Sequence, residues 1–323
     1  MKIQTKERGL QPLIYNRVQR HLTQQTRLNR RILILKARQL GTTTWGTFDR
    51  VWFPTATRTD FNSLIMAHTE ELAEEILGKI ELALELMPEP YKNYLGLDTD
   101  TKYIKSFENL RSRIDIGSFG VGRKGAGAKL GTTRQNFYGT EIADKRVDDD
   151  VLIRGIQNVP KSGYITFDST PNGRAGWFFD ECMKALRGES QFLLCFYPWF
   201  WDDEYFDDPP KRFKPHGDEK ELVGRLGLTP GQIAWRRRKI DELGAELFRQ
   251  EYPENPYDCF LFSGASAFPQ IHLAEYAEKE GYCKARTEAG RLADYPSVTC
   301  VLQRVDAQGR PEGSHQAHTG TGA

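Results

Sequence analysis

The fold of this chain is decided by the stretch Ile32-Leu33-Ile34-Leu35-Lys36-Ala37-Arg38-Gln39-Leu40-Gly41-Thr42-Thr43-Thr44. Its first four residues are apolar, too few for a helix, and a glycine-containing turn follows them, which is typical of a buried parallel strand. The turn precedes a predicted helix, so backbone N–H groups and the helix N-terminus can surround phosphate oxygens. The stretch therefore predicts a phosphate-binding loop, in which Gln39 and Gly41 are candidate contacts.

The predicted loop differs from the usual phosphate loop, which ends in Gly-Lys-Ser/Thr. Thr42 occupies the position of the lysine, so the positive charge must come from Lys36 or Arg38. Thr43 is placed to put its hydroxyl on Mg²⁺. The alternative is an ordinary strand-turn-helix connection with a basic turn.

Apolar runs and helical patterns alternate on both sides of this stretch. The segment 70–87 has apolar residues at four-residue spacing and is stopped by Pro88, which predicts an amphipathic helix. A second helix is predicted at 177–186, and further strands are predicted at 63–67, 113–117, 136–139, 164–168 and 192–197. Strands alternating with helices predict an α/β sheet with helices on both faces.

The character of the sequence changes near Trp199, where Asp, Pro, Lys and Gly become frequent. Thr229-Pro230 then opens a helical pattern that runs through an arginine triplet to Leu243, which predicts a small second subdomain. The last thirty or so residues, including 309–323, are poor in large apolar residues and rich in Gly, Ser, Thr and His. Such a segment cannot bury enough surface to fold alone, so we expect it to be disordered.

Composition excludes few classes of partner. Lysine plus arginine (45) nearly balances aspartate plus glutamate (44), so the net charge neither supports nor excludes DNA. The five cysteines include no CxxC pair and no histidine at metal-ligand spacing, which favours reduced thiols over a zinc site. No stretch approaches the roughly 20 apolar residues that span a bilayer. We expect a soluble cytoplasmic protein with no membrane contact.

A second candidate motif is the strand 136–140, which delivers Glu141 at its carboxyl end, the edge at which doubly wound sheets bind ligands. A glutamate there can orient or deprotonate the water that attacks a γ-phosphate. Thr140 stands where an aspartate usually precedes the glutamate, so Mg²⁺ would lack a carboxylate from this position and could be held through water. The alternative is a surface glutamate that ends a strand.

A third motif, Ser169-Thr170-Pro171-Asn172-Gly173, follows the strand at 164–168 at the same sheet edge. Its small hydroxyl and amide groups could sense a γ-phosphate. Taken alone it is a weak signal, because Pro-Asn-Gly is a frequent turn sequence with no chemistry attached.

Together, the order and content of these motifs resemble the large terminase subunits of tailed bacteriophages, in the branch whose phosphate loop reads Lys-Ala-Arg-Gln-Leu-Gly with a small residue replacing the usual lysine. The resemblance covers roughly 12–268 and continues through Gly139-Thr140-Glu141-Ile142-Ala143, Asp168 to Gly173, Tyr197-Pro198-Trp199, Glu251-Tyr252-Pro253 and Phe260 to Gly264. It implies a doubly wound P-loop NTPase sheet at 1–198, a small linker or lid subdomain at 199–268, and a truncated nuclease remnant at 269–323, largely disordered at its end.

The resemblance also implies roles for single residues. Gln19 would contact the adenine edge, and Glu141 would be the catalytic glutamate. The coupling motif would consist of Ser169, Thr170 and Asn172.

A basic segment, Gly122 to Gly127, lies where such motors carry an arginine offered to a neighbouring subunit. Arg123 is the residue expected to stabilise charge on the γ-phosphate in this way, with Lys129 and Arg134 as alternatives. The other interpretation is a solvated basic loop.

The function implied is an ATP-hydrolysing, Mg²⁺-dependent motor that moves double-stranded DNA into a procapsid. Its expected partners are a portal protein, a small terminase subunit and further copies of itself in a ring, in the cytoplasm of an infected or lysogenic bacterium.

Nuclease activity is not expected from this chain. The family's nuclease domain holds two metal ions on clustered aspartates, whereas Asp294 and Asp306 are the only aspartates after Phe268. The acidic run 148–150 is expected to be a solvated loop. Two rivals remain: another P-loop translocase such as a helicase, and a catalytically impaired nucleotide-binding remnant of a prophage, suggested by Thr42 and Thr140.

Overall fold

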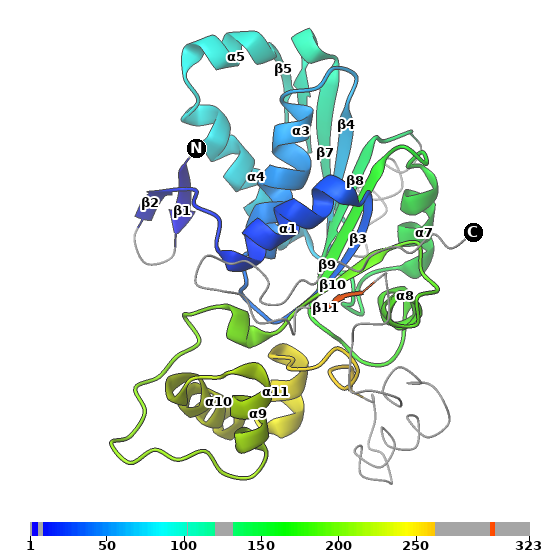
Figure 1. Cartoon of the computed structure of the whole chain (residues 1–323). Helices are drawn as coiled ribbons and strands as arrows, with labels where there is room; N and C mark the ends of the chain where they lie inside the picture. The colour runs from blue at the N-terminus through cyan, green and yellow to red at the C-terminus, as the bar shows by residue number, and fades with distance from the viewer. Residues whose placement is uncertain (1, 6–8, 102, 120–131, 262–297, 301–323) are drawn as a thin grey trace, which may run out of the picture.

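A single large sheet organises the chain in the computed structural model, which describes residues 2–5, 9–101, 103–119, 132–261 and 298–300 (Figure 1). Within these residues the strand order is β11-β10-β3-β9-β8-β4-β7-β6-β5. The strands from β11 to β7 are parallel, and β6 and β5 extend the sheet as antiparallel strands. The strand bounds are β3 Arg31–Lys36, β4 Asn62–Ala67, β5 Leu97–Asp100, β6 Ile104–Phe107, β7 Ser112–Ser118, β8 Asn136–Thr140, β9 Tyr164–Ser169, β10 Leu193–Tyr197 and β11 Val298–Cys300. The predicted α/β fold is confirmed.

Alternate residues of the central strands face opposite sides of the sheet, and both sides are covered, so these strands are apolar along much of their length. Leu33 and Leu35 of β3 pack with α7 (Asp149–Gln157) and α8 (Trp177–Leu186) on one face. Ile32 and Ile34 pack on the other face against α1 (Arg17–Leu28), and α4 (Glu70–Glu85) covers β4 and β7 on that same side. Helices therefore cover both faces of the sheet, as Figure 1 shows.

Local capping signals explain where several helices begin. Thr69 caps α4, and Thr229 forms a capping box at α10 (Pro230–Leu243), as the sequence predicts for these helices. The prediction of a loop at 148–150 is wrong, although the three aspartates are solvent-exposed as predicted. The Asp148 side chain accepts hydrogen bonds from the first turn of α7, whose other two aspartates suit the positive end of the helix dipole.

The helix after the phosphate loop is continuous but irregular. It runs through α2 (Thr42–Trp45), a π-helical segment η1 (Gly46–Trp52) and α3 (Phe53–Thr55). A Cβ on Gly46 would lie 2.1 Å from the Tyr138 ring, so only glycine allows this helix to lie so close to β8. Wide turns of this kind occur often at functional sites.

A small helical subdomain follows β10. It contains η3 (Trp199–Trp201), α9 (Asp218–Leu226), α10 and α11 (Ala245–Glu251), the last three lying together at one end of the molecule in Figure 1. Its core is an aromatic cluster formed by Trp199, Tyr205, Trp235, Phe248 and Tyr252. This cluster is continuous with the apolar layer over β3 and β10, so the subdomain is packed against the sheet.

The arginine triplet of α10 is used inside the subdomain. Arg236 pairs with Glu254 and Asp218, Arg237 with Glu219, and Arg238 with Asp207 and Glu242. These guanidinium groups therefore stabilise the packing of α10 against its neighbours.

His21 lies on α1, where its Nδ1 is 2.7 Å from the Tyr197 hydroxyl and its ring packs edge-on against Trp201. Burial, helped by the charge of Arg17, lowers the pKa of His21 from 6.5 to about 4. Between pH 6.5 and about pH 4, His21 is protonated in the unfolded chain but stays neutral in the folded chain. The free energy of unfolding therefore falls as the pH is lowered through this range.

We expect the free energy of unfolding to drop by about 2 kcal/mol more between pH 7.5 and pH 5 in the wild type than in His21→Gln. Urea unfolding of both proteins at the two pH values measures this difference. The other titrating groups are common to both proteins, so equal pH dependence in the two would contradict the buried, neutral state of His21.

At the two ends of the chain the structure describes short strands. β1 (Lys2–Thr5) and β2 (Gly9–Pro12) form a separate antiparallel pair. β11 pairs with β10 at the edge of the main sheet. The rest of the predicted nuclease remnant lies outside the described residues, as do Arg123 and Lys129. Within the described residues, no helix is both long and apolar enough to span a membrane.

Candidate functional site

The candidate phosphate loop lies at the carboxyl end of β3 and is held by its backbone from two sides. On one side, the Ala37 N–H donates to Tyr197 O at 2.9 Å and the Arg38 N–H donates to Glu251 O at 3.0 Å. The Tyr205 hydroxyl donates to Arg38 O at 2.5 Å. Three segments of the chain beyond β9 therefore fix the first half of the loop.

On the other side, the start of α1 holds the second half of the loop. The Asn16 side chain donates to Leu40 O at 3.1 Å, and the Gln19 side chain donates to Gly41 O at 2.8 Å. Gln19 also completes the capping box of α1. In this structure its amide therefore supports the loop, and contact with an adenine edge stays a prediction.

Gly41 has φ +75°, and a Cβ there would lie 2.7 Å from the Gln19 amide nitrogen. Gly41→Ala should lower the free energy of unfolding by at least about 1 kcal/mol, because the left-handed backbone and the contact both disfavour a side chain. The matched control is Gly78→Ala within α4, where nothing lies within 4 Å and a gain of up to about 1 kcal/mol is expected. Chemical unfolding of the two variants measures both effects, and equal stability changes would contradict the geometry of the loop.

Lys36 ends β3 and its Nζ lies 2.8 Å from Glu141 Oε1, with only 4% of the lysine side chain exposed. Burial alone lowers the pKa of Lys36, but the carboxylates of Glu141 and Asp168 outweigh it and the pKa is raised. Burial likewise acts to raise the pKa of Glu141, and Lys36 reverses the effect, so that pKa is lowered. Both groups are therefore charged at neutral pH.

Glu141 follows β8 directly and has φ +56°, which is uncommon for a residue with a side chain. Its Oε2 lies 3.4 Å from both the Ser169 hydroxyl and the Thr170 N–H. Strained backbone at such a position is frequent in functional sites. The structure thus brings two of the predicted coupling residues onto the predicted catalytic carboxylate.

A chain of hydroxyl groups leads from the loop into the sheet. Thr43 Oγ1 lies 3.4 Å from Thr140 Oγ1, and Thr140 Oγ1 donates to Asp168 Oδ1 at 2.8 Å. The hydroxyl of Tyr138 donates to the other Asp168 oxygen. Asp168 is fully buried, and burial raises its pKa. Asp168 was not a predicted site residue; the signal available was an acidic residue in a mostly apolar strand.

The two candidate cations of the loop differ in their surroundings. Arg38 is 58% exposed and its Nε lies 3.0 Å from Glu251 Oε2. Lys36 is buried beside Glu141. The structure therefore places Lys36 at the sheet edge and directs Arg38 towards the subdomain.

Two further predicted residues, Asn172 and Arg134, are not among the residues in contact with Glu141 described above. Asn172 is partly buried in the turn after β9. Arg134, an alternative for the residue offered to a neighbour, is 3% exposed and pairs with Asp115 at 2.7 Å. A buried, paired guanidinium is poorly suited to act on another subunit.

The donor set suits a Mg²⁺ ion that arrives with nucleotide phosphates. Among the described residues no group of three or more His, Cys, Asp or Glu side chains could hold a metal ion. Mg²⁺ is usually bound through one or two carboxylates together with substrate phosphates and water. The Thr43 hydroxyl, with Thr140 and the buried Asp168 carboxylate behind it, fits that pattern.

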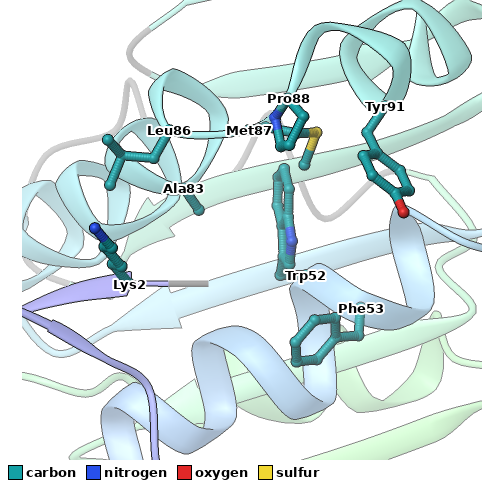
Figure 2. Close-up of a pocket in the computed structure, with 8 residues that line it drawn as sticks. All are labelled: Lys2, Trp52, Phe53, Ala83, Leu86, Met87, Pro88 and Tyr91. Atoms are coloured by element: carbon teal, nitrogen blue, oxygen red, sulfur yellow. The ribbon is translucent and has the colours of Figure 1, made fainter.

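A separate pocket of about 530 Å³ lies at the far end of the helix that follows the loop (Figure 2). It is lined by Lys2, Trp52, Phe53, Ala83, Leu86, Met87, Pro88 and Tyr91. With one cation and an otherwise largely apolar lining, it lacks the grouped polar donors that a triphosphate requires. The chemistry of the candidate site is instead at the loop.

Comparison with known proteins finds relatives by structure alone. No family model matches the chain, and no curated protein matches it. The large terminase of the HK97 bacteriophage superposes with a TM-score of 0.54 at 14% identity, over 76% of this chain and 52% of that chain. A large terminase from a thermophilic bacteriophage, in complex with ATP-γ-S, gives 0.48 at 12% identity, over 77% and 53%. The ATPase domain of the Thermus phage P74-26 large terminase gives 0.48 at 17% identity, over 75% and 92%.

The likeness to the HK97 protein shows that about three quarters of this chain shares the fold of about half of that large terminase. The chain spans about half the length of the HK97 terminase and of the thermophilic-phage terminase solved with ATP-γ-S. At this level of identity the comparison concerns the fold, and activity must be argued from the site.

Proposed function

We propose that this chain binds ATP with Mg²⁺ at the loop from Lys36 to Thr43 and hydrolyses it as the motor of a phage large terminase. The energy released would move double-stranded DNA into a procapsid. The proposal includes no nuclease activity in this chain.

The observation that carries the proposal is that two charged side chains and one backbone N–H group lie together at one edge of the sheet. The carboxylate of Glu141, which follows β8, lies within hydrogen-bonding distance of two other groups. These are the ammonium of Lys36 at the end of β3 and the Thr170 N–H after β9. In open parallel sheets, ligands bind beyond the carboxyl ends of the strands. A cation, an acidic group and a backbone donor are what phosphoryl transfer to water requires there.

Each group has a chemical task in this proposal. Lys36 and the N-terminus of α2 bind phosphate oxygens, because both are positively polarised. Glu141 orients the attacking water and accepts its proton. Mg²⁺, when bound, would neutralise charge on the phosphates. Since Lys36 pairs with Glu141 before ATP arrives, the phosphates must compete for the ammonium and release the carboxylate towards the water.

In this proposal, the motifs at 197–199 and 251–253 connect the phosphate loop to the helical subdomain. The loop residues Ala37 and Arg38 are bonded to Tyr197, Glu251 and Tyr205. A shift of the loop on nucleotide binding would therefore reach the aromatic cluster directly. Ser169, Thr170 and Asn172 would report the presence of the γ-phosphate, and Arg123 would act on the site of a neighbouring copy.

The proposed partners are DNA, a portal protein, a small terminase subunit and copies of this chain in a ring. These partners are proposed from the terminase-like fold together with the candidate site. The arginine triplet of α10 gives no support for DNA binding, because its guanidinium groups form ion pairs within the subdomain.

The test is phosphate release by the purified chain in Mg²⁺ and ATP, with and without long linear double-stranded DNA. A motor is expected to turn over ATP and to do so faster with DNA. A chain that binds ATP but releases no phosphate in either condition would support the impaired remnant, which Thr42 and Thr140 suggest. Stimulation by single-stranded DNA alone would favour a helicase-like translocase.

A further inference from the structure

Among the described residues of the candidate site, Asp168 has a buried carboxylate that the proposed mechanism does not use. It lies on β9, the strand between the phosphate-loop strand β3 and the Glu141 strand β8. In register it is paired with Thr140 on one side and Ile34 on the other. It is therefore one residue from the same sheet edge that carries Lys36 and Glu141.

The position beside it lacks a carboxylate. Thr140 is the residue that directly precedes Glu141, and its hydroxyl bridges the space between Thr43 and Asp168. The sequence pattern expects an acidic group at Thr140, and the structure places one on the adjacent strand, hydrogen-bonded to that threonine. An acidic side chain on the neighbouring strand therefore contacts the threonine that stands where an aspartate is usual.

The charge balance at this edge also favours a divalent cation. Lys36 is the ammonium nearest to both carboxylates, and its Nζ is bonded to Glu141. Arg38 is directed to Glu251. Among the described residues, one lysine faces two acidic side chains here, so their ionised forms leave a surplus negative charge beside a loop that must accept anionic phosphates. A divalent cation that arrives with the nucleotide would remove this surplus.

The Asp168 carboxylate accepts hydrogen bonds from two neighbouring hydroxyl groups. Tyr138 donates to one of its oxygens and Thr140 donates to the other. Groups in this position behind a metal ligand orient the ligand and tune metal affinity.

We propose that Asp168 supplies the negative charge that fixes the nucleotide's divalent cation, acting through the Thr140 hydroxyl and the hydroxyl of Thr43 in place of a carboxylate at position 140. Asp168 is thus a positioning residue. The inference rests on the proposed nucleotide site and specifies how that site selects a metal–nucleotide complex over free nucleotide.

The experiment measures equilibrium binding of a fluorescent, non-hydrolysed ATP analogue in excess Mg²⁺ and in EDTA. The wild type should bind more tightly with Mg²⁺. Asp168→Asn should lose about 10- to 100-fold of affinity in Mg²⁺, with little change in EDTA. Tyr138→Phe is the matched control, because it removes a hydrogen bond to the same carboxylate without removing its charge, and it should keep most of the metal dependence.

A double variant, Thr140→Asp with Asp168→Asn, moves the carboxylate to the neighbouring strand at constant charge. It should restore much of the Mg²⁺ dependence that Asp168→Asn loses. Mn²⁺ binding with the analogue, followed by electron paramagnetic resonance, gives the same comparison without any catalytic turnover.

Unchanged Mg²⁺ dependence in a folded Asp168→Asn variant overturns the inference and leaves Asp168 a structural group. If thermal melting shows that Asp168→Asn does not fold, Thr140→Val decides instead, because it interrupts the connection from Thr43 to Asp168; unchanged metal dependence there overturns the inference equally. Failure of the wild type to bind nucleotide at all would instead remove the proposed function.

Discussion

Replacing Glu141 by glutamine is expected to reduce ATP turnover by at least about 100-fold while ATP binding stays nearly intact. A positioned general base contributes about 10²- to 10⁴-fold to such a reaction. The amide keeps the shape of the side chain and can still accept a hydrogen bond from Lys36, but it cannot take a proton from water. Steady-state phosphate release gives the rate, and titration with a fluorescent ATP analogue gives the affinity.

The control for this variant is Asp144→Asn, which neutralises a nearby carboxylate that pairs with Arg146 outside the loop. It should leave turnover close to that of the wild type. If Glu141→Gln hydrolyses ATP as fast as Asp144→Asn, Glu141 has no part in the chemistry.

Replacing Lys36 by alanine should have two separable consequences. ATP affinity should fall about 10- to 100-fold, because a charge-assisted hydrogen bond to phosphate contributes about 1.5–3 kcal/mol. The free energy of unfolding should fall by about 1–3 kcal/mol, because Glu141 loses the cation that compensates its burial. Arg38→Ala is the matched control: its side chain is 58% exposed, so its pair with Glu251 contributes at most about 1 kcal/mol.

The double variant Lys36→Ala with Glu141→Gln separates the two consequences. It should recover stability, since no uncompensated carboxylate remains, but it should not recover nucleotide binding. If Arg38→Ala weakens ATP binding more than Lys36→Ala does, the loop takes its charge from the arginine and the role of Lys36 is structural.

Much of the fold could be predicted because the central strands are short apolar runs followed by recognisable turns. The runs at 32–35, 63–67 and 164–168 lie within β3, β4 and β9, and α8 has the predicted bounds. The three strands are buried on both faces, so their composition alone identifies them. The helix α10 was predictable from its Thr-Pro start, which is a local signal.

Other elements depend on contacts that no local pattern reveals. The antiparallel strands β5 and β6 are mostly polar and short, and the π-helical segment η1 depends on close packing of Gly46 on Tyr138. The acidic run before α7 contained a capping signal, but consecutive aspartates also suit a solvated loop.

Some residues of the candidate site were likewise predictable from local sequence, whereas others depend on how the elements pack. Lys36 and Glu141 were predictable as ends of strands, and the structure places them 2.8 Å apart. Which cation faces the site, and that Gln19 holds the loop, depend on how α1 and α11 pack beside β3. The part played by Asp168 depends on β9 lying between β3 and β8, a strand order that the sequence does not state.

The most direct test of the account is an experimental structure of this chain with Mg²⁺ and a non-hydrolysable ATP analogue. The account predicts the γ-phosphate beside Lys36, the β-phosphate over the N-terminus of α2, and the Glu141 carboxylate turned from Lys36 towards a water near the γ-phosphorus. A nucleotide bound elsewhere, for example in the pocket beside Trp52 and Tyr91, with the Lys36–Glu141 pair unchanged, would contradict it.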